Sequence, residues 1–362
     1  MLSTAEDLQS EALPTPAQLC RVLPADSQTA TTVARARQAM RNIMHGHDDR
    51  LAVIIGPCSI HDPRAALDYA TRLAAQRVLF GDKLDITMRV YFEKPRSTIG
   101  WKGLINDPFL DGSHEIGEGL RIARQLLLDI NAMGLPAACE FLDTVTPHYI
   151  ADLVSWGAIG ARTTESQPHR QMASALPCPI GFKNGTQGDI GIAIDAAVTA
   201  SHPHRFLGTD AHGRIAITAS PGNTDGHIIL RGGRQPNYDT ASVASACAQL
   251  RRSGLAPRLM VDASHANSGK DPARQMDVIT DLSARICAGE DAVFGVMIES
   301  NLISGRQDLR PGTALTYGQS ITDACLGWDE SVALLAELAN AVRVRRLTHG
   351  QHQPSLCQAP CT

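Results

Sequence analysis

From residue 51 onward, short runs of apolar, β-prone residues alternate with longer stretches in which apolar residues recur at helical spacing. The apolar runs cover 51–55, 86–92, 137–142, 158–162, 180–183, 227–231, 259–262 and 294–299. Amphipathic stretches lie at 63–80, 117–133, 188–200, 242–253 and 273–288, and a last one covers 331–346. Consecutive apolar positions are typical of strands buried on both faces of a parallel sheet. Eight strands alternating with helices predict an α/β fold, the (β/α)8 TIM barrel.

Two segments depart from this alternation. Residues 1–48 contain a helical pattern at 31–44, preceded by Pro14, Pro16 and Pro24, which we expect to interrupt any earlier helix. We interpret this N-terminal helical extension as an arm for regulation or oligomerisation, the alternative being a frayed tail. Two short apolar runs, 205–208 and 215–219, flank a polar turn and predict a small β-hairpin inserted at about 204–220. The catalytic barrel is expected at 49–348, followed by a disordered tail at 349–362.

Composition narrows the class of protein. The chain has 362 residues, of which 43% are hydrophobic and 19% charged, as in an ordinary globular protein with a large core. A formal net charge of −4 without a basic face argues against nucleic-acid binding. The start has no apolar signal region and no run is long enough to span a membrane, so we expect no membrane partner. Nine cysteines without a CxxC pair indicate a reducing compartment, the cytoplasm.

Cations gather where the predicted strands end, which is the edge that carries the active site in such a barrel. Five cations lie there: Arg89, Lys94, Arg162, Lys183 and Arg231. Ion pairs with Glu140, Asp143 and Glu165 are the structural alternative, since a lone buried charge is costly. Convergence of all five favours a site for a phosphate and a carboxylate, because Arg donates two parallel hydrogen bonds and Lys offers a point charge.

A basic loop follows the second predicted strand, with the sequence KPRSTIGWKG at 94–103. It places Lys94, Arg96 and Lys102 among hydroxyl side chains such as Thr98 and two glycines. This composition is typical of a phosphate-binding loop between a strand and a helix. The loop therefore indicates phosphorylated, anionic small molecules as substrates.

Four further residues near strand ends are candidate metal ligands: Cys58, His265, Glu299 and Asp323. A thiolate, an imidazole and two carboxylates suit Mn, Fe, Co or Zn, although no spacing is that of a zinc finger. Taken singly, Cys58 could be a core thiol and His265 a hydrogen-bonded loop histidine. His61 is a candidate general base, or a residue that supports the metal ligands, and Asp62 is a candidate N-cap for a helix from Pro63.

Several segments together resemble the type I 3-deoxy-D-arabino-heptulosonate 7-phosphate (DAHP) synthases. They are GPCSIHD (56–62), YFEKPRSTIGWKG (91–103), EFLDTVTP (140–147), WGAIGARTTESQ (156–167), GFKNGT (181–186), HIILRGG (227–233), VDASHANSGKD (261–271), GVMIESN (295–301) and YGQSITDACLGW (317–328). The resemblance extends over about 50–346 in the family's order, and KPRSTIGWKG with SHANSGK and SITDAC is not a generic barrel signature.

The resemblance implies a condensation of phosphoenolpyruvate with erythrose 4-phosphate that releases phosphate, the first step of the shikimate pathway to chorismate and the aromatic amino acids. It implies a divalent metal ion on the four candidate ligands and phosphoenolpyruvate on the five strand-end cations. Arg96 and Thr98 would hold the phosphate of the aldose. Lys94 would donate a proton to the new alkoxide, and His61 or Glu140 would handle the attacking water.

The resemblance also implies feedback inhibition by an aromatic amino acid at a site built from the arm and the hairpin. It assigns Pro147, Leu176, Phe206 and Gly208 to that site. Gly208 is the residue type found at this position in the tyrosine-sensitive members, whereas phenylalanine-sensitive members carry Ser. The missing side chain would leave room for a phenolic hydroxyl. Pro177 stands where related sequences have Ser. A homodimer or homotetramer is expected.

Two alternative functions remain at this point. A 3-deoxy-octulosonate 8-phosphate synthase uses the same barrel and phosphoenolpyruvate with a longer sugar phosphate, but the KPRSTIGWKG loop argues against it. A catalytically inactive sensor of aromatic amino acids is disfavoured by the complete set of candidate metal ligands, because an inactive copy should lose ligands first.

One expectation does not depend on the family. Asp323 and Cys325 are two residues apart, so in an extended loop their side chains point the same way. If Asp323 and Cys58 share a metal ion, Cys325 lies near Cys58. The metal-free protein is therefore expected to form a Cys58–Cys325 disulfide.

Overall fold

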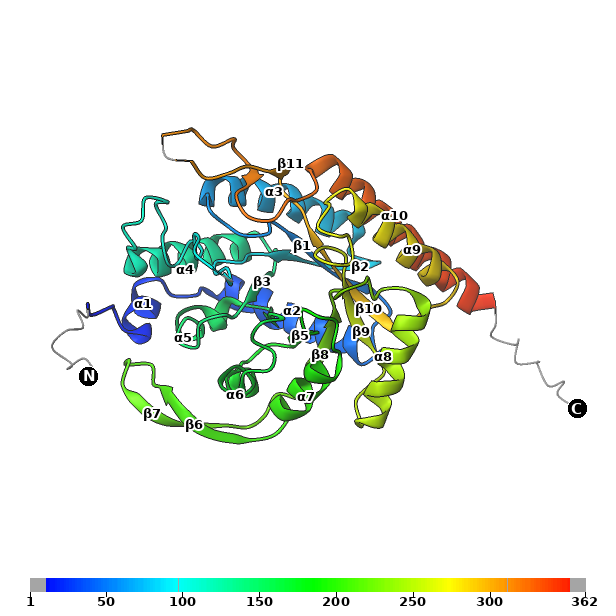
Figure 1. Ribbon diagram of the computed structural model, residues 1–362, viewed down its shortest axis with the longest axis horizontal. Coiled ribbons are helices and arrows are strands. Elements are labelled where there is room, and N and C mark those ends of the chain that lie inside the picture. The colour runs from blue at the N-terminus through cyan, green and yellow to red at the C-terminus, as the bar shows by residue number, and fades with distance from the viewer. Residues whose placement is uncertain (1–10, 97, 311, 352–362) are drawn as a thin grey trace, which may run out of the picture.

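The predicted strands close into one parallel barrel and are buried almost throughout (Figure 1). The computed structural model describes residues 11–96, 98–310 and 312–351. The barrel strands are β1 (Leu51–Gly56), β2 (Leu84–Arg89), β3 (Ala137–Glu140), β4 (Trp156–Ile159), β5 (Ile180–Lys183), β8 (Gly226–Leu230), β9 (Leu259–Asp262) and β10 (Val293–Glu299). They pair in the order β1-β10-β9-β8-β5-β4-β3-β2, and β2 returns to β1. The barrel predicted from the apolar runs is confirmed.

Longer helices form the outer layer, in which α9 and α10 lie side by side (Figure 1). They are α3 (Pro63–Phe80), α4 (Ile116–Ala132), α7 (Gly191–Ala200), α8 (Thr240–Arg252), α9 (Arg274–Cys287) and α10 (Trp328–Gln351). Asp62 caps α3 by accepting a hydrogen bond from the N–H of Arg64, as the sequence predicts. Because α10 reaches Gln351, the first residues of the expected tail are helical, and 352–362 lie outside the described residues. Among the described helices, none has the length and apolar character needed to cross a membrane.

Several short elements were not predicted by the hydrophobic pattern. They are α5 (Pro147–Ile150), η2 (Ala151–Leu153), α6 (Gln167–Ala175), β11 (Ile303–Arg306) and β12 (Gln319–Ser320). Helical periodicity needs about three turns to be recognised, and these helices offer less. The sequence therefore predicted the alternation of strands and helices, but it did not predict the two helices α5 and α6 that follow β3 and β4.

The N-terminal arm closes the bottom of the barrel. Alternate strand residues point inward and form a separate apolar cluster, which includes Trp156 and Phe294. α2 (Ser27–Met44) packs Met40, Ile43 and Met44 against that cluster. Outside the barrel, the other face of each strand packs against the ring of helices. The arm is thus part of the folded core.

α1 (Pro16–Val22) corrects the expectation that the early prolines interrupt any helix. Pro16 occupies the first helical position, where its missing N–H leaves no hydrogen bond unmade. Thr15 and Gln18 form a reciprocal capping box around it. The proline at 16 therefore starts a helix.

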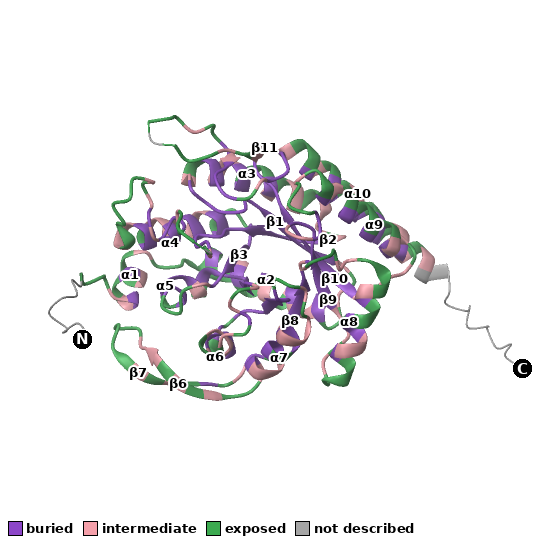
Figure 2. Cartoon of the chain, viewed as in Figure 1, coloured by how far each residue is buried: buried purple, intermediate pink, exposed green. Residues whose placement is uncertain are grey.

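The predicted hairpin is confirmed as β6 (His204–Thr209) and β7 (Ile215–Ser220), an antiparallel pair outside the ring of helices (Figure 1). Its side chains alternate between two faces. Phe206 and Gly208 are half-buried, whereas Leu207, Ile215 and Ile217 are 82%, 85% and 68% exposed. Figure 2 shows that much of the hairpin is exposed. The far end of the hairpin meets the arm, since the N–H of Ala17 donates to the carbonyl of Ala211 over 2.8 Å.

Candidate active site and effector pocket

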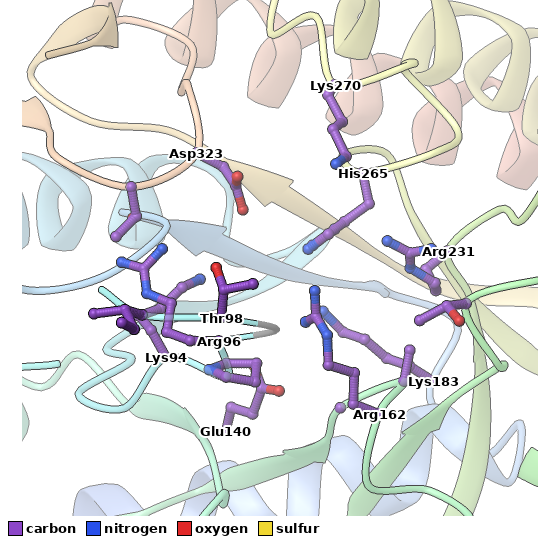
Figure 3. A pocket seen from close by; sticks show the side chains of 16 residues that line it. Lys94, Arg96, Thr98, Glu140, Arg162, Lys183, Arg231, His265, Lys270 and Asp323 are labelled. Carbon is purple, nitrogen blue, oxygen red and sulfur yellow. The ribbon is translucent and has the colours of Figure 1, made fainter. Parts of the chain in front are cut away.

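A cavity of about 300 Å³ lies at the carboxyl ends of the barrel strands (Figure 3). Its lining includes most of the predicted site residues, namely Lys94, Arg96, Thr98, Glu140, Arg162, Lys183, Arg231, His265 and Asp323. In Figure 3 their side chains converge from several loops on one central space. Because every loop follows a different strand, the closed barrel is what brings these distant parts of the sequence together.

Four predicted residues do not line this cavity. Cys58 and Glu299 lie just beneath its floor, and the Cys58 thiol is 3.6 Å from an oxygen of Asp323. Arg89 is buried behind them, where it donates to Glu299 over 3.0 Å and lies 3.7 Å above the ring of Tyr91. His61 is also buried away from the cavity, and burial lowers its pKa. The predicted contact of Arg89 with phosphoenolpyruvate and the predicted role of His61 remain untested.

The cavity also contains residues that sequence reasoning missed: Thr186, Lys270 and Thr322. Each follows or precedes a predicted site residue by a short distance in the chain. Lys270 lies in the same loop as His265, and Thr322 directly precedes Asp323. A search of whole strand-end loops, rather than of their first charged residue, would have found them.

The structure supports a metal site at the floor of the cavity. One ligand atom each from Cys58, Glu299 and Asp323 lies within 4.8 Å of the other two. The fourth predicted ligand adjoins this group, because Nε2 of His265 is 3.9 Å from Oε1 of Glu299. Nδ1 of His265 is held by Asp262 at 3.0 Å, which leaves Nε2 directed at the other ligands. A thiol, two carboxylates and an oriented imidazole fit a borderline divalent ion.

The charges around Cys58 also fit a metal thiolate. Burial and the nearby Glu299 raise the pKa of the Cys58 thiol to about 11. Nζ of Lys94 lies 3.1 Å from the sulfur. Burial alone would lower the pKa of Lys94, but the neighbouring acidic groups, which include Glu299 and Asp323, outweigh burial and raise it. Without a metal ion the sulfur is thus a protonated thiol, and a bound cation would have to displace its proton.

The carboxylate of Glu140 depends on a glycine beside it. A Cβ added to Gly160 would lie 2.1 Å from Oε1 of Glu140, far inside van der Waals contact. We predict that Gly160→Ala displaces the Glu140 carboxylate and lowers kcat by about tenfold or more, if Glu140 handles a proton. The melting temperature should change little, because the displaced atom is the end of a flexible side chain.

Gly226→Ala is the matched control for this variant. A Cβ there meets its nearest atoms at 3.5 Å, which is ordinary contact, so both kcat and melting temperature should be retained. Phosphate release and thermal unfolding of the two variants check the prediction. Full activity of Gly160→Ala would contradict a proton-transfer role for Glu140.

Cys325 lies beside Cys58, as the spacing from Asp323 suggested. Both side chains are fully buried, and burial together with the nearby Cys58 raises the pKa of the Cys325 thiol. We predict that the metal-free protein forms this disulfide in air, with oxygen as the oxidant. The count of free thiols in denaturant should then fall from nine to seven, whereas Cys325→Ser should lose none by this route. An unchanged count in the metal-free protein would refute it.

A second cavity, of about 760 Å³ and largely apolar, lies between the hairpin and the helices that follow β3 and β4. All four predicted effector residues line it: Pro147, Leu176, Phe206 and Gly208. Pro177 lines it as well. The arm reaches its surroundings, because the Tyr149 hydroxyl of α5 donates to the carbonyl of Pro14 over 2.8 Å. The cavity is large and apolar enough for an aromatic side chain.

Comparisons with known proteins agree on one family. Residues 24–336 of the chain match the sequence profile of the DAHP synthetase I family. The Phe-sensitive phospho-2-dehydro-3-deoxyheptonate aldolase of Escherichia coli K12 is 59% identical over 336 residues, covering 93% of this chain and 96% of the relative. The Trp-sensitive phospho-2-dehydro-3-deoxyheptonate aldolase of Enterobacter agglomerans is 55% identical over 331 residues, covering 91% of this chain and 95% of the relative.

A solved structure gives the same result for the fold. The phospho-2-dehydro-3-deoxyheptonate aldolase of Francisella tularensis SCHU S4 superposes with a TM-score of 0.92 at 50% sequence identity. The match covers 93% of this chain and 99% of that structure. The family resemblance of the sequence motifs is therefore confirmed, and the chain belongs to the DAHP synthetase I family of enzymes.

Proposed function

We propose that the protein is a DAHP synthase, which joins phosphoenolpyruvate to erythrose 4-phosphate. C3 of phosphoenolpyruvate forms a bond to the aldehyde carbon, water adds at C2, and inorganic phosphate leaves, giving 3-deoxy-D-arabino-heptulosonate 7-phosphate. The observation that carries this proposal is a single cavity in which a wall of cations adjoins a cluster of metal-ligating side chains. Family membership supports the same reaction.

The cations Arg162, Lys183 and Arg231 would bind phosphoenolpyruvate. They come from neighbouring strands, and Figure 3 shows Arg162, Lys183 and Arg231 on the same side of the cavity. Lys183 is fixed by Asp262, which lies 3.1 Å from its ammonium group. Fixed cations offset the repulsion between two anionic substrates and hold the reacting carbons close together.

The KPRSTIGWKG loop would hold the sugar phosphate. Arg96 and Thr98 lie on its cavity side, and Nε of Arg96 donates to the carbonyl of Trp101 over 2.7 Å. This leaves the outer N–H groups of Arg96 for a phosphate. Lys94, at the base of the loop, is the candidate proton donor to the alkoxide that forms at the former aldehyde.

A divalent ion, Mn, Fe, Co or Zn, would be held by Cys58, His265, Glu299 and Asp323, where it would supply Lewis-acid polarisation of the aldehyde. Glu140 is the better candidate for handling the water, because it lines the cavity and His61 does not. The complete ligand cluster also disfavours the inactive-sensor alternative.

A phosphate-release assay with both substrates tests the proposed reaction. Activity should need phosphoenolpyruvate and erythrose 4-phosphate together, and it should disappear with a chelator and return with added Mn²⁺. Arabinose 5-phosphate in place of the four-carbon sugar should be a poor substrate. Preference for arabinose 5-phosphate would favour the octulosonate alternative instead.

We further propose that the second cavity is the effector site and that tyrosine is the effector. Gly208 adds no side chain to the wall, and the Thr218 hydroxyl lies only 2.6 Å from where a Cβ of Gly208 would stand. That space, with a hydroxyl partner beside it, suits a phenolic group. We predict inhibition by tyrosine that exceeds inhibition by phenylalanine or tryptophan, and that weakens in Gly208→Ser. Absence of a tyrosine response in the assay would reject the effector.

The exposed apolar face of the hairpin supports a homodimer or homotetramer. Leu207, Ile215 and Ile217 form a side of β6 and β7 that lacks cover within the described residues. A second copy of the chain is the proposed cover, and the mass in solution tests it.

All seven cysteines in the described residues are free thiols, which supports the proposal that the protein functions in the reducing cytoplasm.

A further inference from the structure

Lys270 is a cation on the wall of the catalytic cavity that has no role in the predicted site. It belongs to the loop after β9, five residues beyond His265. It also borders the small space beside Glu299 and Asp323. Figure 3 shows its side chain extending from that loop toward His265. Lys270 thus lies on the metal-ligand side of the cavity.

The head group of Lys270 is one of three open cations in the cavity. Lys94 is held by Cys58, Lys183 by Asp262, and Arg96 by a backbone carbonyl. In contrast, the head groups of Arg162, Arg231 and Lys270 have no hydrogen-bond or ion-pair partner within the described residues. Unpartnered cations on a cavity wall mark places where a ligand's oxygen atoms bind.

The backbone gives a second, independent indication. His265 and Lys270 both adopt the left-handed region, with φ of 59° and 65°, and the N–H of Lys270 donates to the carbonyl of His265 over 2.7 Å. Glycine holds such a conformation without strain, whereas a side chain with a Cβ does not. Strain of this kind gathers at functional sites. The loop therefore holds two strained residues whose side chains both reach the cavity.

The position of Lys270 indicates which of the two substrates it would bind. Arg162 and Arg231, the open cations assigned to phosphoenolpyruvate, come from the loops after β4 and β8. Lys270 lies on the other side, where it lines the same two spaces as His265 and Asp323. The aldehyde end of the sugar must lie beside Asp323 if the metal polarises it. An ammonium group there has three donors for the carbonyl and hydroxyl oxygens of the sugar.

We propose that Lys270 is a further substrate-binding residue, which binds the oxygen atoms of the sugar phosphate on the Asp323 side of the cavity. The inference rests on the proposed function, because it presumes a sugar phosphate as second substrate.

Two variants test the proposal in the full-length, metal-loaded enzyme. Lys270→Met keeps most of the side-chain length without the charge, and Lys270→Gly suits the left-handed backbone and should be at least as stable. Both should raise KM for erythrose 4-phosphate by about 10- to 100-fold, the usual effect of losing a charged hydrogen bond. KM for phosphoenolpyruvate, and the directly measured affinity of the enzyme for phosphoenolpyruvate, should stay within about twofold of the values of the unmodified enzyme. Lys83→Met, in a surface pair with Asp82, is the control and should change none of these values.

Distinct outcomes overturn the proposal. Unchanged KM for erythrose 4-phosphate in both variants would mean that Lys270 does not bind the sugar. An equal rise in KM for phosphoenolpyruvate would assign Lys270 to the other substrate, and loss of bound Mn²⁺ would assign it to the metal site. Failure of the unmodified enzyme to release phosphate from the two substrates would instead refute the proposed function, and this is measured before any variant is compared.

Discussion

Cys58→Ala is expected to lose bound divalent metal and to release phosphate at less than about a thousandth of the normal rate, since Lewis-acid assistance is worth several kcal/mol. The sulfur is the one soft ligand of the proposed set, and it lies fully buried beneath the cavity. Without the sulfur, a metal ion held by the carboxylates of Glu299 and Asp323 would have one ligand fewer. Metal analysis of the purified variant and the phosphate-release assay measure both effects.

A second buried cysteine provides the control for this variant. Cys247 lies on α8, and its thiol donates to the carbonyl of Pro257 over 3.3 Å. Cys247→Ala should cost stability through a small cavity, roughly 1–2 kcal/mol, but should retain metal and kcat. If Cys58→Ala keeps its metal and its rate, the proposed ligand set is wrong. Equal losses in both variants would indicate unfolding instead of ligand loss.

Lys94→Met is the second variant with a large expected effect. Its ammonium group lies between the Cys58 sulfur, at 3.1 Å, and the cavity that it lines. Methionine keeps the length of the side chain and removes the proton and the charge. Loss of a general acid lowers kcat by roughly 10²- to 10⁴-fold, so we expect a fall in that range with KM for each substrate less affected.

Lys102→Met separates this effect from a general change in the loop. Lys102 is exposed in the same basic loop, and it contacts Lys94 through its backbone carbonyl, which the substitution keeps. The control should therefore retain kcat. A Lys94→Met enzyme with nearly normal kcat and a raised KM for phosphoenolpyruvate would show that Lys94 binds substrate and does not donate the proton.

The sequence was sufficient to predict the barrel because its strands are continuous apolar runs with a recognisable length. It was also sufficient to predict most of the cavity, because a parallel barrel brings every strand end to the same face. Arg162 and Lys183 are separated by a whole helix in the chain, and both line the cavity. This part of the prediction needed only the order of the elements.

Features that depend on local backbone geometry or on burial were not predicted. The capped start of α1 at Pro16 requires the position of Thr15 relative to the helix, which composition alone does not specify. The ion pair of Arg89 with Glu299 and its place over the ring of Tyr91 were not predicted, because a strand-end position does not specify a side chain's partners, and its contact with phosphoenolpyruvate stays a prediction. Lys270 was missed because it lies five residues beyond His265 in the loop after β9, whereas the prediction used the charged residues nearest each strand end. Strand-end position thus predicts the neighbourhood of a side chain but not its direction.

If the second cavity is the effector site, as we propose, the inserted hairpin separates regulation from catalysis. β6 and β7 form a sheet of their own, outside the barrel, yet they supply Phe206 and Gly208 to the wall of the second cavity. Substitutions in this ribbon therefore leave every barrel strand pair and every catalytic loop in place. Related aldolases at 55–59% identity are named for different effectors, Phe and Trp. A lineage could retune which end product it senses through a few residues of one hairpin, while the machinery that makes the product stays constant.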